Sequence, residues 1–351
     1  MKYKFVSGAL PDTRDDNAKM RDYRIEELAT APVIEWVDFE TWKQKNKNLL
    51  DQMKIHNQNG AGSCVGNSIA NALSIINYYE EGKFLYFSPR LYYANRSNKP
   101  QPGMNIDDAG KLPVKLGAIF ESELPSDLKS EEEMNRLDDM VKSYETIGKI
   151  YAPGSFFHLP FTIDKFAEAI ANYKAVVMFV KFGDGEWGVD VPQIKTINPQ
   201  YGHGVCSFSY CMYQGKKSLV IVDSWGVDNP LKGLRILTED WFNNNRIFGA
   251  ITYVDLKNKE FTEETVLPKY TFNRDLYYGL TRDPDVKKLQ EVLYLMGYFN
   301  YDTFTGNYYG LTVDAVMKFQ LANGIIKSKT DEGAGRCGPL TRSVLNKMLN
   351  K

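Results

Sequence analysis

A cysteine behind a glycine-rich loop is the first residue whose type and position could do chemistry. The loop reads Gln-Asn-Gly-Ala-Gly-Ser before Cys64, and apolar residues follow at helical spacing at Ile69, Leu73 and Ile76. Cys64 is therefore predicted to lie in the first turn of a helix, where unpaired backbone N–H groups and the helix dipole favour a thiolate. The alternative is a buried, inert cysteine, as most unpaired cysteines are.

A general base for this thiolate must come from one of only three histidines. His203 begins an apolar run, Tyr-Gly-His-Gly-Val, 139 residues after Cys64. Twenty residues further along, Asp223 ends the β-forming stretch Leu-Val-Ile-Val-Asp and precedes Ser-Trp-Gly, which contains Trp225. A thiol, an imidazole and a carboxylate are the groups that acyl transfer through a covalent intermediate requires.

These motifs resemble those of the papain-like cysteine peptidases, and both their order and their spacing agree. In that family a Gln six residues before the Cys completes the oxyanion hole, the His lies in a Gly-His-Ala-Val strand, and Asn-Ser-Trp-Gly supplies the residue that orients the His. The resemblance implies that Gln58 is the oxyanion residue and Cys64 the nucleophile. It further implies that His203 is the base and Asp223 its orienting partner.

Three positions depart from the family pattern. Ala61 and Val65 replace the cysteine and the aromatic residue that usually flank the nucleophile, and Asp223 stands where the family has Asn. The first two changes concern stability more than chemistry. An Asp can still accept the imidazole N–H and would stabilise the imidazolium. If the Asp instead impairs the site, the fold is a relic without activity.

The totals describe an ordinary soluble globular protein of two domains. The chain has 351 residues, 43% of them hydrophobic and 25% charged, and a formal net charge of −1. Nothing in this balance indicates binding to nucleic acid. No apolar span is long enough to cross a membrane, and the N-terminus has too short an apolar core for a signal peptide. We therefore expect synthesis in a cytoplasm, without a signal peptide.

The four cysteines are expected to be unpaired. Cys206 and Cys211 are five residues apart on one predicted strand, which would point them to opposite faces, and Cys337 stands alone in the second domain. Unpaired thiols fit a cytoplasmic origin. His56 and His158 have no ligand-spaced partner in the sequence and are expected to be surface or packing residues. No metal and no cofactor is expected.

The resemblance implies an α+β fold with two lobes, a helical lobe headed by Cys64 and a β-rich lobe carrying His203, with the cleft between them. It also implies that the glycine turn at Gly103 lies along the substrate, although Met104 replaces a glycine there, and that Trp225 shields the His–Asp contact. A loop over 183–201, containing Trp187, could form one wall of the cleft. The predicted boundaries are a leader at 1–30, the peptidase domain at 31–256, a linker at 257–281 and a three-helix domain at 282–351.

Local patterns predict the main elements of the peptidase domain. Strands are predicted over 175–182, 205–213, 218–223, 234–237 and 251–256, an amphipathic helix over 162–173, and a charged, solvated helical stretch over 127–150. The resemblance implies one further strand over 31–42, which looks like the first strand of the mature family domain.

The last 70 residues contain two related halves, each with an apolar helix followed by a glycine turn. The signatures are the paired Leu-Gln and Phe-Gln steps and the glycine–threonine turns at Gly310 and Gly338. They resemble the peptidoglycan-binding domain of many cell-wall hydrolases, over about 283–349. Leu289, Phe319 and Leu345 are expected to be core residues. Binding would use exposed residues, for which the candidates are Tyr298, Tyr308 and Arg336.

Together these features predict a cysteine endopeptidase whose second domain holds it at a bacterial cell wall. A wall-binding domain raises the local concentration of peptidoglycan, which favours its stem or cross-bridge peptides as substrate. The layout is typical of a phage endolysin, a monomer that acts at the wall after release or in the virion. Two alternatives remain open. One is a protease of ordinary proteins, tethered to a wall or used in phage maturation, and the other is a catalytically silent wall-binding or virion structural protein.

Overall fold

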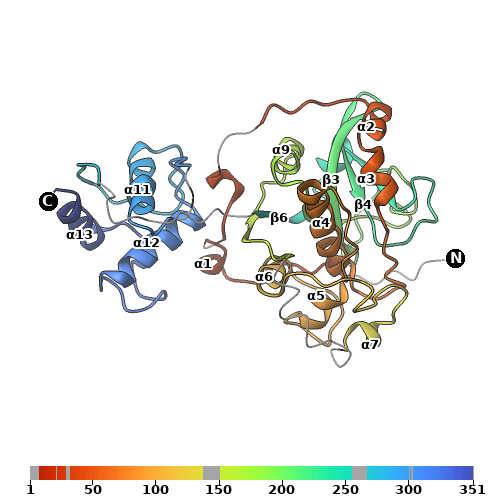
Figure 1. Cartoon of the computed structure of the whole chain (residues 1–351), viewed down its shortest axis with the longest axis horizontal. Coiled ribbons are helices and arrows are strands. Elements are labelled where there is room, and N and C mark those ends of the chain that lie inside the picture. Colours follow the sequence, from red (N-terminus) through yellow and green to blue (C-terminus); the bar gives the residue numbers. More distant parts are fainter. Residues whose placement is uncertain are drawn as a thin grey trace. The chain divides into compact units, whose positions relative to one another are not determined.

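The chain divides into two compact units in the computed structural model (Figure 1). The first unit contains Met1–Asp12 and Pro32–Val254, and the second contains Thr13–Ala31 and Asp255–Lys351. The structure describes residues 8–20, 22–28, 32–136, 151–254, 267–299, 301 and 303–350. Within these ranges, no helix is both long and apolar enough to cross a membrane.

A six-stranded antiparallel sheet forms the β-rich part of the first unit. Its spatial order is β1-β6-β2-β3-β4-β5, with β3 and β4 at the centre of the site described below. The strands are β1 (Ser155–His158), β2 (Val176–Lys181), β3 (Gly202–Tyr213), β4 (Lys216–Val222), β5 (Leu234–Thr238) and β6 (Ile247–Val254). A two-residue turn at Gln214 and Gly215, both at positive φ, joins β3 to β4 as a hairpin.

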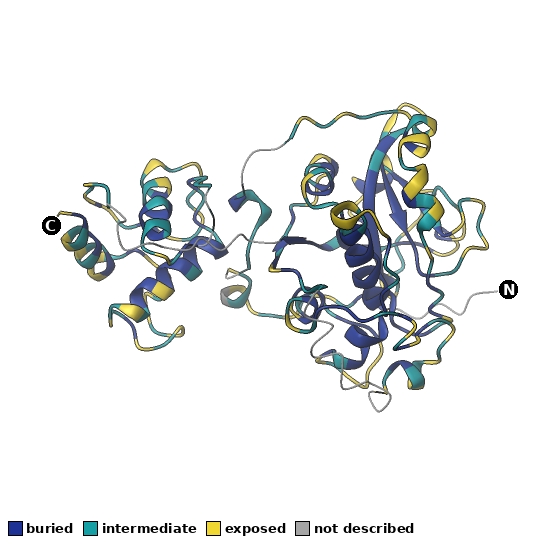
Figure 2. Cartoon of the chain, in the orientation of Figure 1, coloured by how far each residue is buried: buried dark blue, intermediate teal, exposed yellow. Residues whose placement is uncertain are grey.

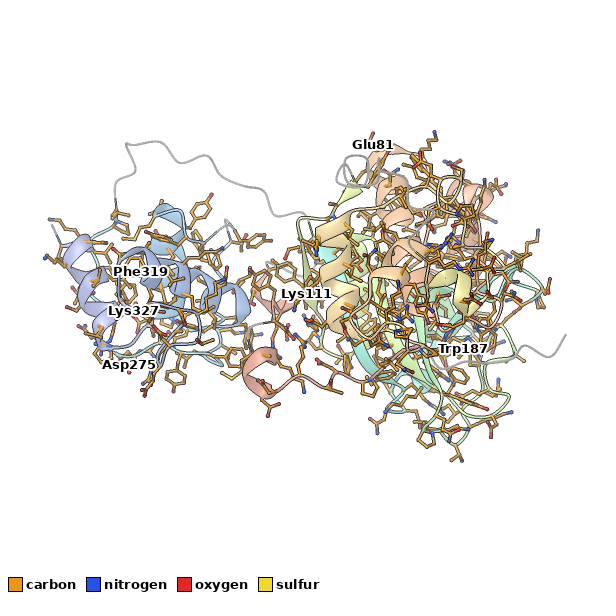
Figure 3. The ribbon with its side chains drawn as sticks, turned by 90° about the horizontal axis from the view of Figure 1, so that it is seen from below. Glu81, Lys111, Trp187, Asp275, Phe319 and Lys327 are labelled. Carbon is orange, nitrogen blue, oxygen red and sulfur yellow. The ribbon has the colours of Figure 1, made fainter. Side chains whose placement is uncertain are left out.

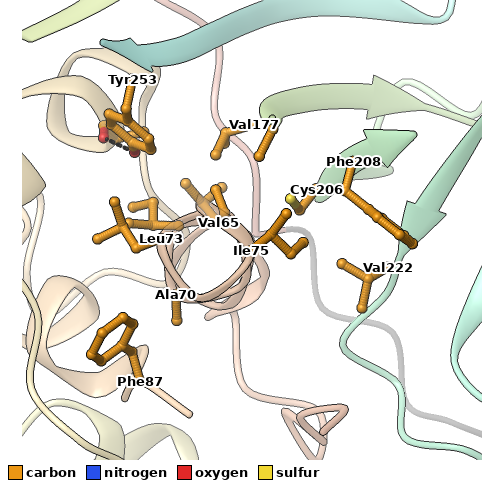
Figure 4. Close-up of a cluster of buried hydrophobic side chains, with 14 of the residues drawn as sticks. Val65, Ala70, Leu73, Ile75, Phe87, Val177, Cys206, Phe208, Val222 and Tyr253 are labelled. Carbon is orange, nitrogen blue, oxygen red and sulfur yellow. Dashed lines mark hydrogen bonds between the residues drawn. The ribbon is translucent and has the colours of Figure 1, made fainter. Parts of the chain in front are cut away.

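The helix α4 (Cys64–Glu81) is buried around most of its circumference (Figure 2). It packs against β2 and β3 on one side and against α5 (Arg90–Asn95) and α6 (Ile106–Leu116) on another. Alternate residues of the strands, including Val177 and Cys206, join it in one apolar cluster (Figure 4). A helix that is buried on nearly all sides is a core helix, so the first turn of α4 has a fixed place against the sheet.

Shorter helices complete the first unit. They are α2 (Phe39–Lys45), α3 (Lys47–Gln52), α7 (Glu131–Met134), α9 (Ile163–Tyr173) and α10 (Glu239–Phe242). The helix predicted over 162–173, the buried strand over 175–182 and the hairpin over 205–223 are confirmed by α9, β2 and the β3–β4 pair. Most of the predicted stretch 127–150 lies outside the described residues, and its described part contains α7.

Two local predictions for the first unit are wrong. The strand expected over 31–42 is instead an irregular segment followed by α2, because Asp38 caps that helix by accepting from the N–H of Thr41. Cys206 and Cys211 both belong to the apolar cluster around α4 rather than to opposite faces, because a β-bulge between Ser207 and Ser209 shifts the alternation. Both thiols are free, as expected.

The C-terminal part of the second unit contains the helices α11 (Pro284–Leu295), α12 (Gly310–Ala322) and α13 (Pro339–Leu349). Leu289, Phe319 and Leu345 are fully buried core residues, as expected; Figure 3 labels Phe319. The two related halves of this unit share one pattern of hydrogen bonds. In the first half, the buried Gln290 accepts from Gly306 N–H and donates to the Thr312 hydroxyl. The same set recurs one helix later, in Gln320, Gly335 and Thr341.

Most of the predicted leader, from residue 13 to residue 30, is part of the second unit, which here includes Thr13–Ala31. They contain α1 (Asp16–Lys19) and the 3-10 helix η1 (Ile25–Glu27). The side chain of Glu27 is buried at the start of α12, where it accepts from the N–H groups of Leu311 and Thr312 at 2.7 and 3.2 Å. The described part of the predicted linker, residues 267–281, also bonds into this unit, through a bridge between Leu276 and Cys337.

Candidate active site

Cys64 is the first residue of α4, as predicted from the glycine-rich loop before it. The sulfur is therefore close to the unpaired N–H groups of the first helical turn, whose dipole favours negative charge. Its Sγ also accepts a hydrogen bond from the backbone N–H of Gly204 at 3.2 Å. The side chain is fully buried. These contacts supply fixed, positively polarised groups to a sulfur that would carry charge as a thiolate.

Gly204 explains how β3 approaches α4 closely enough to bring an imidazole to this sulfur. A Cβ added at Gly204 would lie 2.8 Å from the Cα of Val65 and 2.9 Å from its N, which is too close for any side chain. The preceding residue, His203, faces the same turn of α4, and the charge of Cys64 acts on its imidazole. The predicted nucleophile and base are thus brought together.

Asp223 follows the end of β4 and completes the line from the sulfur. His203 Nε2 lies 2.8 Å from Asp223 Oδ1, and both side chains are buried. Burial alone would lower the pKa of His203, but the charges of Asp223 and Cys64 raise it to about 9. Burial likewise opposes ionisation of Asp223, yet His203 and Arg235 hold the pKa of that carboxyl well below its usual range. The arrangement favours an imidazolium beside the charged carboxylate of Asp223.

Gln58, the predicted oxyanion residue, lies in the loop before Cys64 and bonds to the loop after β4. Its backbone N–H donates to the carbonyl of Ser224 at 2.9 Å, and its side-chain oxygen accepts from the Ser224 hydroxyl. Its Nε2 donates to the carbonyl of Ala61 at 2.7 Å. An amide nitrogen carries two hydrogens, so one N–H is committed to Ala61 and one is left to donate elsewhere.

The chain's own residues 8–10 lie over the sulfur. A Cβ added at Gly8 would be 2.3 Å from Cys64 Sγ, so only glycine fits there. The backbone continues as an extended segment, in which Leu10 N–H donates to the carbonyl of Met104 and Met104 N–H donates to the carbonyl of Gly8. The N–H groups of Gly8 and Ala9 both point to the carbonyl of Gly202.

The turn at Gly103 lies beside this extended segment of the chain itself. Its φ of 88° is in the left-handed region, and a Cβ there would lie 2.9 Å from the Cγ of Leu10. Met104 in place of a glycine does not prevent the contact, because it uses only its backbone N–H and carbonyl.

Trp225 packs against the imidazole, with its ring centroid 5.4 Å from that of His203. This position fits the expected shielding of the His–Asp contact. Trp187, which Figure 3 labels, was expected in a loop forming a cleft wall, but its side chain is buried. Its Nε1 donates to Asp223 Oδ2 at 2.8 Å, and its ring centroid lies 5.6 Å from that of His203.

Sequence patterns also missed Arg235, which donates from Nε to Asp223 Oδ2 at 2.8 Å. The residue lies on β5, in the stretch Leu-Arg-Ile-Leu, with apolar residues on both sides. A lone cation inside a predicted apolar strand, next to a strand that ends in a carboxylate, was the signal available. A buried charge needs a partner of opposite sign, and Asp223 is that partner.

His56 was expected to lack ligand partners, but the fold brings it to Glu121 and Asp127 in an arrangement that could hold a metal ion. The carboxylates there already accept hydrogen bonds. Asp127 accepts from the N–H of Asn57 at 3.0 Å and from the hydroxyl of Tyr86 at 2.6 Å, and Glu121 accepts from the N–H of Asp127 at 2.9 Å. The contacts tie this loop to the segment that carries Gln58.

The three residues nominated for wall binding have different surroundings. Tyr308 is fully buried and its hydroxyl donates to the carbonyl of Gly335, so the expectation that it is exposed is wrong. Tyr298 is half-buried, with its ring against that of Phe319. The side chain of Arg336 is 56% exposed and pairs with Asp275 at 2.6 Å. Only Tyr298 and Arg336 remain candidates.

Comparison with known proteins agrees with both halves of this description. Residues 282–345 match the family described as putative peptidoglycan binding domain. No curated protein matches the sequence. Among solved structures, xylellain, a cysteine protease from Xylella fastidiosa, is 17% identical with a TM-score of 0.58, covering 73% of this chain and 98% of its own.

A second similar structure is the proform of the cysteine protease Amb a 11, a major ragweed pollen allergen. It is 17% identical with a TM-score of 0.51, and the match covers 79% of this chain and 70% of the allergen. Likeness at such identity establishes fold, and the fold is that of the papain-like cysteine proteases. The predicted α+β, two-lobed architecture followed by a small helical peptidoglycan-binding domain is confirmed.

Proposed function

We propose that the first unit is a cysteine endopeptidase that cleaves amide bonds through a thioester on Cys64. The observation that carries this proposal is the buried line formed by Cys64, His203 and Asp223, with 2.8 Å between the imidazole Nε2 and the carboxylate. The thiolate attacks the amide carbonyl, and His203 gives its proton to the leaving amine. His203 then takes a proton from water, which hydrolyses the thioester and restores the thiol site.

The negative charge on the carbonyl oxygen requires donors that are already in place. The backbone N–H of Cys64 is one candidate, because the first N–H groups of α4 have no partner within the helix. The side-chain amide of Gln58 is the other, through the hydrogen that it does not donate to Ala61. Asp223 would fix the tautomer and orientation of His203 throughout the cycle.

A substrate would enter as an extended peptide in the place of residues 8–10. The contacts of those residues support this route, because they pair backbone to backbone with Met104 and with Gly202. Such pairing does not depend on side chains. The substrate must therefore displace Gly8 from Cys64 before the sulfur can reach a carbonyl.

The substrate that we propose is peptidoglycan, at its stem or cross-bridge peptides, in the manner of a phage endolysin acting at the wall after release or in the virion. The match of residues 282–345 to a peptidoglycan-binding family supports this choice. Linking a binding domain to a catalytic unit raises the effective concentration of the bound polymer. We take the peptidase domain as 31–256 and the wall-binding domain as 282–351, working as a monomer.

A second candidate is a protease of ordinary proteins, tethered to a wall or used in phage maturation. The solved structures of similar fold favour it, since xylellain and Amb a 11 are both described as cysteine proteases. A catalytically silent protein is disfavoured, because Cys64, His203 and Asp223 lie together and buried, with His203 Nε2 at 2.8 Å from Asp223 Oδ1.

Digestion of purified bacterial sacculi, with unfolded casein in parallel, separates these candidates. Wild type is compared with Cys64→Ala, and products are read by mass spectrometry. We expect new amino termini from stem or cross-bridge peptides with wild type and none with Cys64→Ala. Cleaved casein with intact sacculi would instead favour the tethered protease.

Gly8→Leu is included in the same experiment because residues 8–10 cover the sulfur. The added side chain cannot fit 2.3 Å from Cys64 Sγ and would expel the segment. If residues 8–10 block access to Cys64, the wild type should be inactive and Gly8→Leu should be active. The proposed chemistry would be contradicted if, in both the wild type and Gly8→Leu, Cys64 did not react with a thiol-directed covalent inhibitor and neither sacculi nor casein were cut.

A further inference from the structure

Asp223 receives four hydrogen bonds, which is the full capacity of a carboxylate. Oδ1 faces His203 Nε2 at 2.8 Å and accepts from the N–H of Ser224 at 2.7 Å. Oδ2 accepts from Trp187 Nε1 and from Arg235 Nε, each at 2.8 Å. The carboxylate is 1% exposed, so these groups replace water entirely. Only one of the donors besides His203, the guanidinium of Arg235, carries a full charge.

Arg235 is itself held rigidly. It lies on β5 opposite Ile221 of β4, which places it beside the end of β4, where Asp223 follows. Its Nη1 donates to the carbonyl of Val189 at 2.7 Å, and its guanidinium carbon lies 5.4 Å from the ring of Trp187 and 5.7 Å from that of Trp225. Two tryptophan faces and a carbonyl fix the plane of the guanidinium.

The charges in this line balance only when Arg235 is counted. In the reactive state Cys64 is an anion, His203 a cation and Asp223 an anion, which leaves one net negative charge in a buried site. Arg235 cancels it. Uncompensated charge in the protein interior is costly, and without Arg235 the carboxylate would raise the pKa of the imidazolium and make it a weaker acid toward the leaving amine.

Resting on the thiol chemistry proposed above, we propose that Arg235 is a positioning residue, which neutralises Asp223 so that a buried carboxylate can orient His203. The Asp223–Arg235 pair then does the work of one neutral amide. Arg235 acts through Asp223 and does not touch the reacting atoms. The consequence is a linked pair in which changing one member without the other does more harm than changing both.

Few other charges face this line among the described residues. Cys64 and Asp223 are the titratable groups that act on His203, and Arg235 acts on Asp223. The carboxylate of Glu186, on the loop that carries Trp187, is already paired with Arg246 at 3.0 Å. A shift in the ionisation of His203 on changing Arg235 would therefore pass through Asp223.

The test is a mutant cycle of Arg235→Gln, Asp223→Asn and the double variant. Arg235→Gln leaves the carboxylate without its cation, so kcat should fall roughly 100-fold. The uncompensated carboxylate should also raise the pKa of His203, so the alkaline limb of the pH profile of Cys64 alkylation should move up by about one pH unit. Asp223→Asn leaves Arg235 unpaired, so the limb should move down and kcat should fall at least as far. The double variant restores a neutral partner for His203 and should recover at least about tenfold over Asp223→Asn.

The pH dependence is read from alkylation of Cys64 by iodoacetamide, which needs no knowledge of the substrate, and kcat from a peptide that wild type cuts. Arg246→Gln is the matched control, since Arg246 is an equally buried arginine paired with Glu186 in the same unit. It should reduce thermal stability without moving the pH profile. Arg235→Lys keeps the charge and should keep the position of the limb, which guards against a glutamine variant that fails to fold.

Two results would overturn the role of Arg235. One is a double variant in which the losses of kcat from the two single changes add. The other is a folded Arg235→Gln protein whose pH profile is unchanged. A wild-type Cys64 that alkylates like a free thiol, with no limb assignable to His203, would instead overturn the thiol chemistry itself. The two failures are thus distinguishable in the same data.

Discussion

Asp223 and Glu27 are both fully buried carboxyl groups, one in each unit, and they ionise in opposite ways. Glu27 is 0% exposed and Asp223 is 1% exposed. Burial raises the pKa of Glu27 to about 8, so this carboxyl is largely neutral at pH 7. The pKa of Asp223 stays well below its usual range, so that carboxyl is charged.

The neighbours account for the difference. Glu27 accepts from the backbone N–H groups of Arg24, Leu311 and Thr312, which are dipoles and offset only part of the cost of burial. Asp223 faces two cations, His203 and Arg235. Burial by itself therefore keeps a carboxyl neutral, and a charge appears only where a cation is built beside it. The charged arrangement occurs where an imidazolium must be held.

Replacing each acidic side chain by the methyl group of alanine should give the largest effects, on activity for Asp223 and on stability for Glu27. Asp223→Ala removes the orienting partner of His203, and we expect kcat/KM on a peptide to fall about 10³-fold. Glu27→Ala leaves three N–H groups without this acceptor, two of them buried, and we expect the second unit to lose about 3 kcal/mol of unfolding free energy. Peptide hydrolysis and hydrogen exchange of the α12 amides measure the two effects.

Asp240→Ala and Glu332→Ala are the matched controls, because both carboxylates are exposed. Each should change its own measurement by less than twofold or by less than about 0.5 kcal/mol. If Glu27→Ala left the protection of α12 unchanged, the buried carboxyl would not be stabilising that helix. If Asp223→Ala kept a tenth of the activity, another group would be orienting His203.

The sequence predicted best what depends on local pattern and chain order. The placement of Cys64 at a helix start, of His203 on a strand and of Asp223 at the end of the neighbouring strand followed from glycine loops, β-forming runs and spacing. The resemblance to known motifs added their roles. Helix α9 and the β3–β4 hairpin followed from periodicity alone.

What could not be predicted depends on contacts between distant segments. Arg235 and Trp187 reach Asp223 from 12 and 36 residues away, and no local pattern states which carboxylate a buried cation will meet. Gly8 lies over Cys64 and Glu27 contacts α12 because of the course of the backbone between distant segments, which periodicity does not describe. Tyr308 was misjudged because an aromatic residue in a turn can be buried when its hydroxyl finds a carbonyl.

Acidity should sharpen the contrast between the two carboxyls. The pKa of Glu27 is about 8 in the folded chain against 4.5 as its ordinary value, so between these values the folded chain holds a proton that the unfolded chain has released. Stability of the second unit should therefore fall as pH rises, by roughly 2 kcal/mol between pH 4.5 and 6.5. Hydrogen exchange of α12, corrected for the intrinsic pH dependence of exchange, measures it.

The stability of the first unit should not fall between pH 4.5 and 6.5. The contribution of Asp223 is present above its ordinary value of 3.8 and is lost only in stronger acid, as pH falls through its lowered pKa. His203 contributes fully below 6.5, and its contribution is lost as pH rises through about 9. Amides of β3 should thus hold their protection from pH 4.5 to 6.5. Glu27→Gln, which cannot ionise, should remove the slope in α12, and a slope that survived would belong to another group.

The smallest effect is expected from Trp187, the neutral donor to Asp223 Oδ2. Trp187→Phe keeps a ring beside Phe182 and Trp241 but removes the N–H that lies 2.8 Å from the carboxylate. Arg235 still holds the same oxygen, so we expect kcat/KM to fall only about tenfold, the size of one hydrogen bond to a charged group.

Trp241→Phe is its control, since Trp241 is equally buried and donates to Glu186 instead. The two variants should lose similar thermal stability, yet only Trp187→Phe should slow turnover by more than twofold. Equal slowing in both would mean that packing, and not the bond to Asp223, sets the rate. Slowing as large as that of Asp223→Ala would mean that Arg235 alone cannot hold the carboxylate, and that a charged partner orients a buried acid only when a neutral donor fixes its plane.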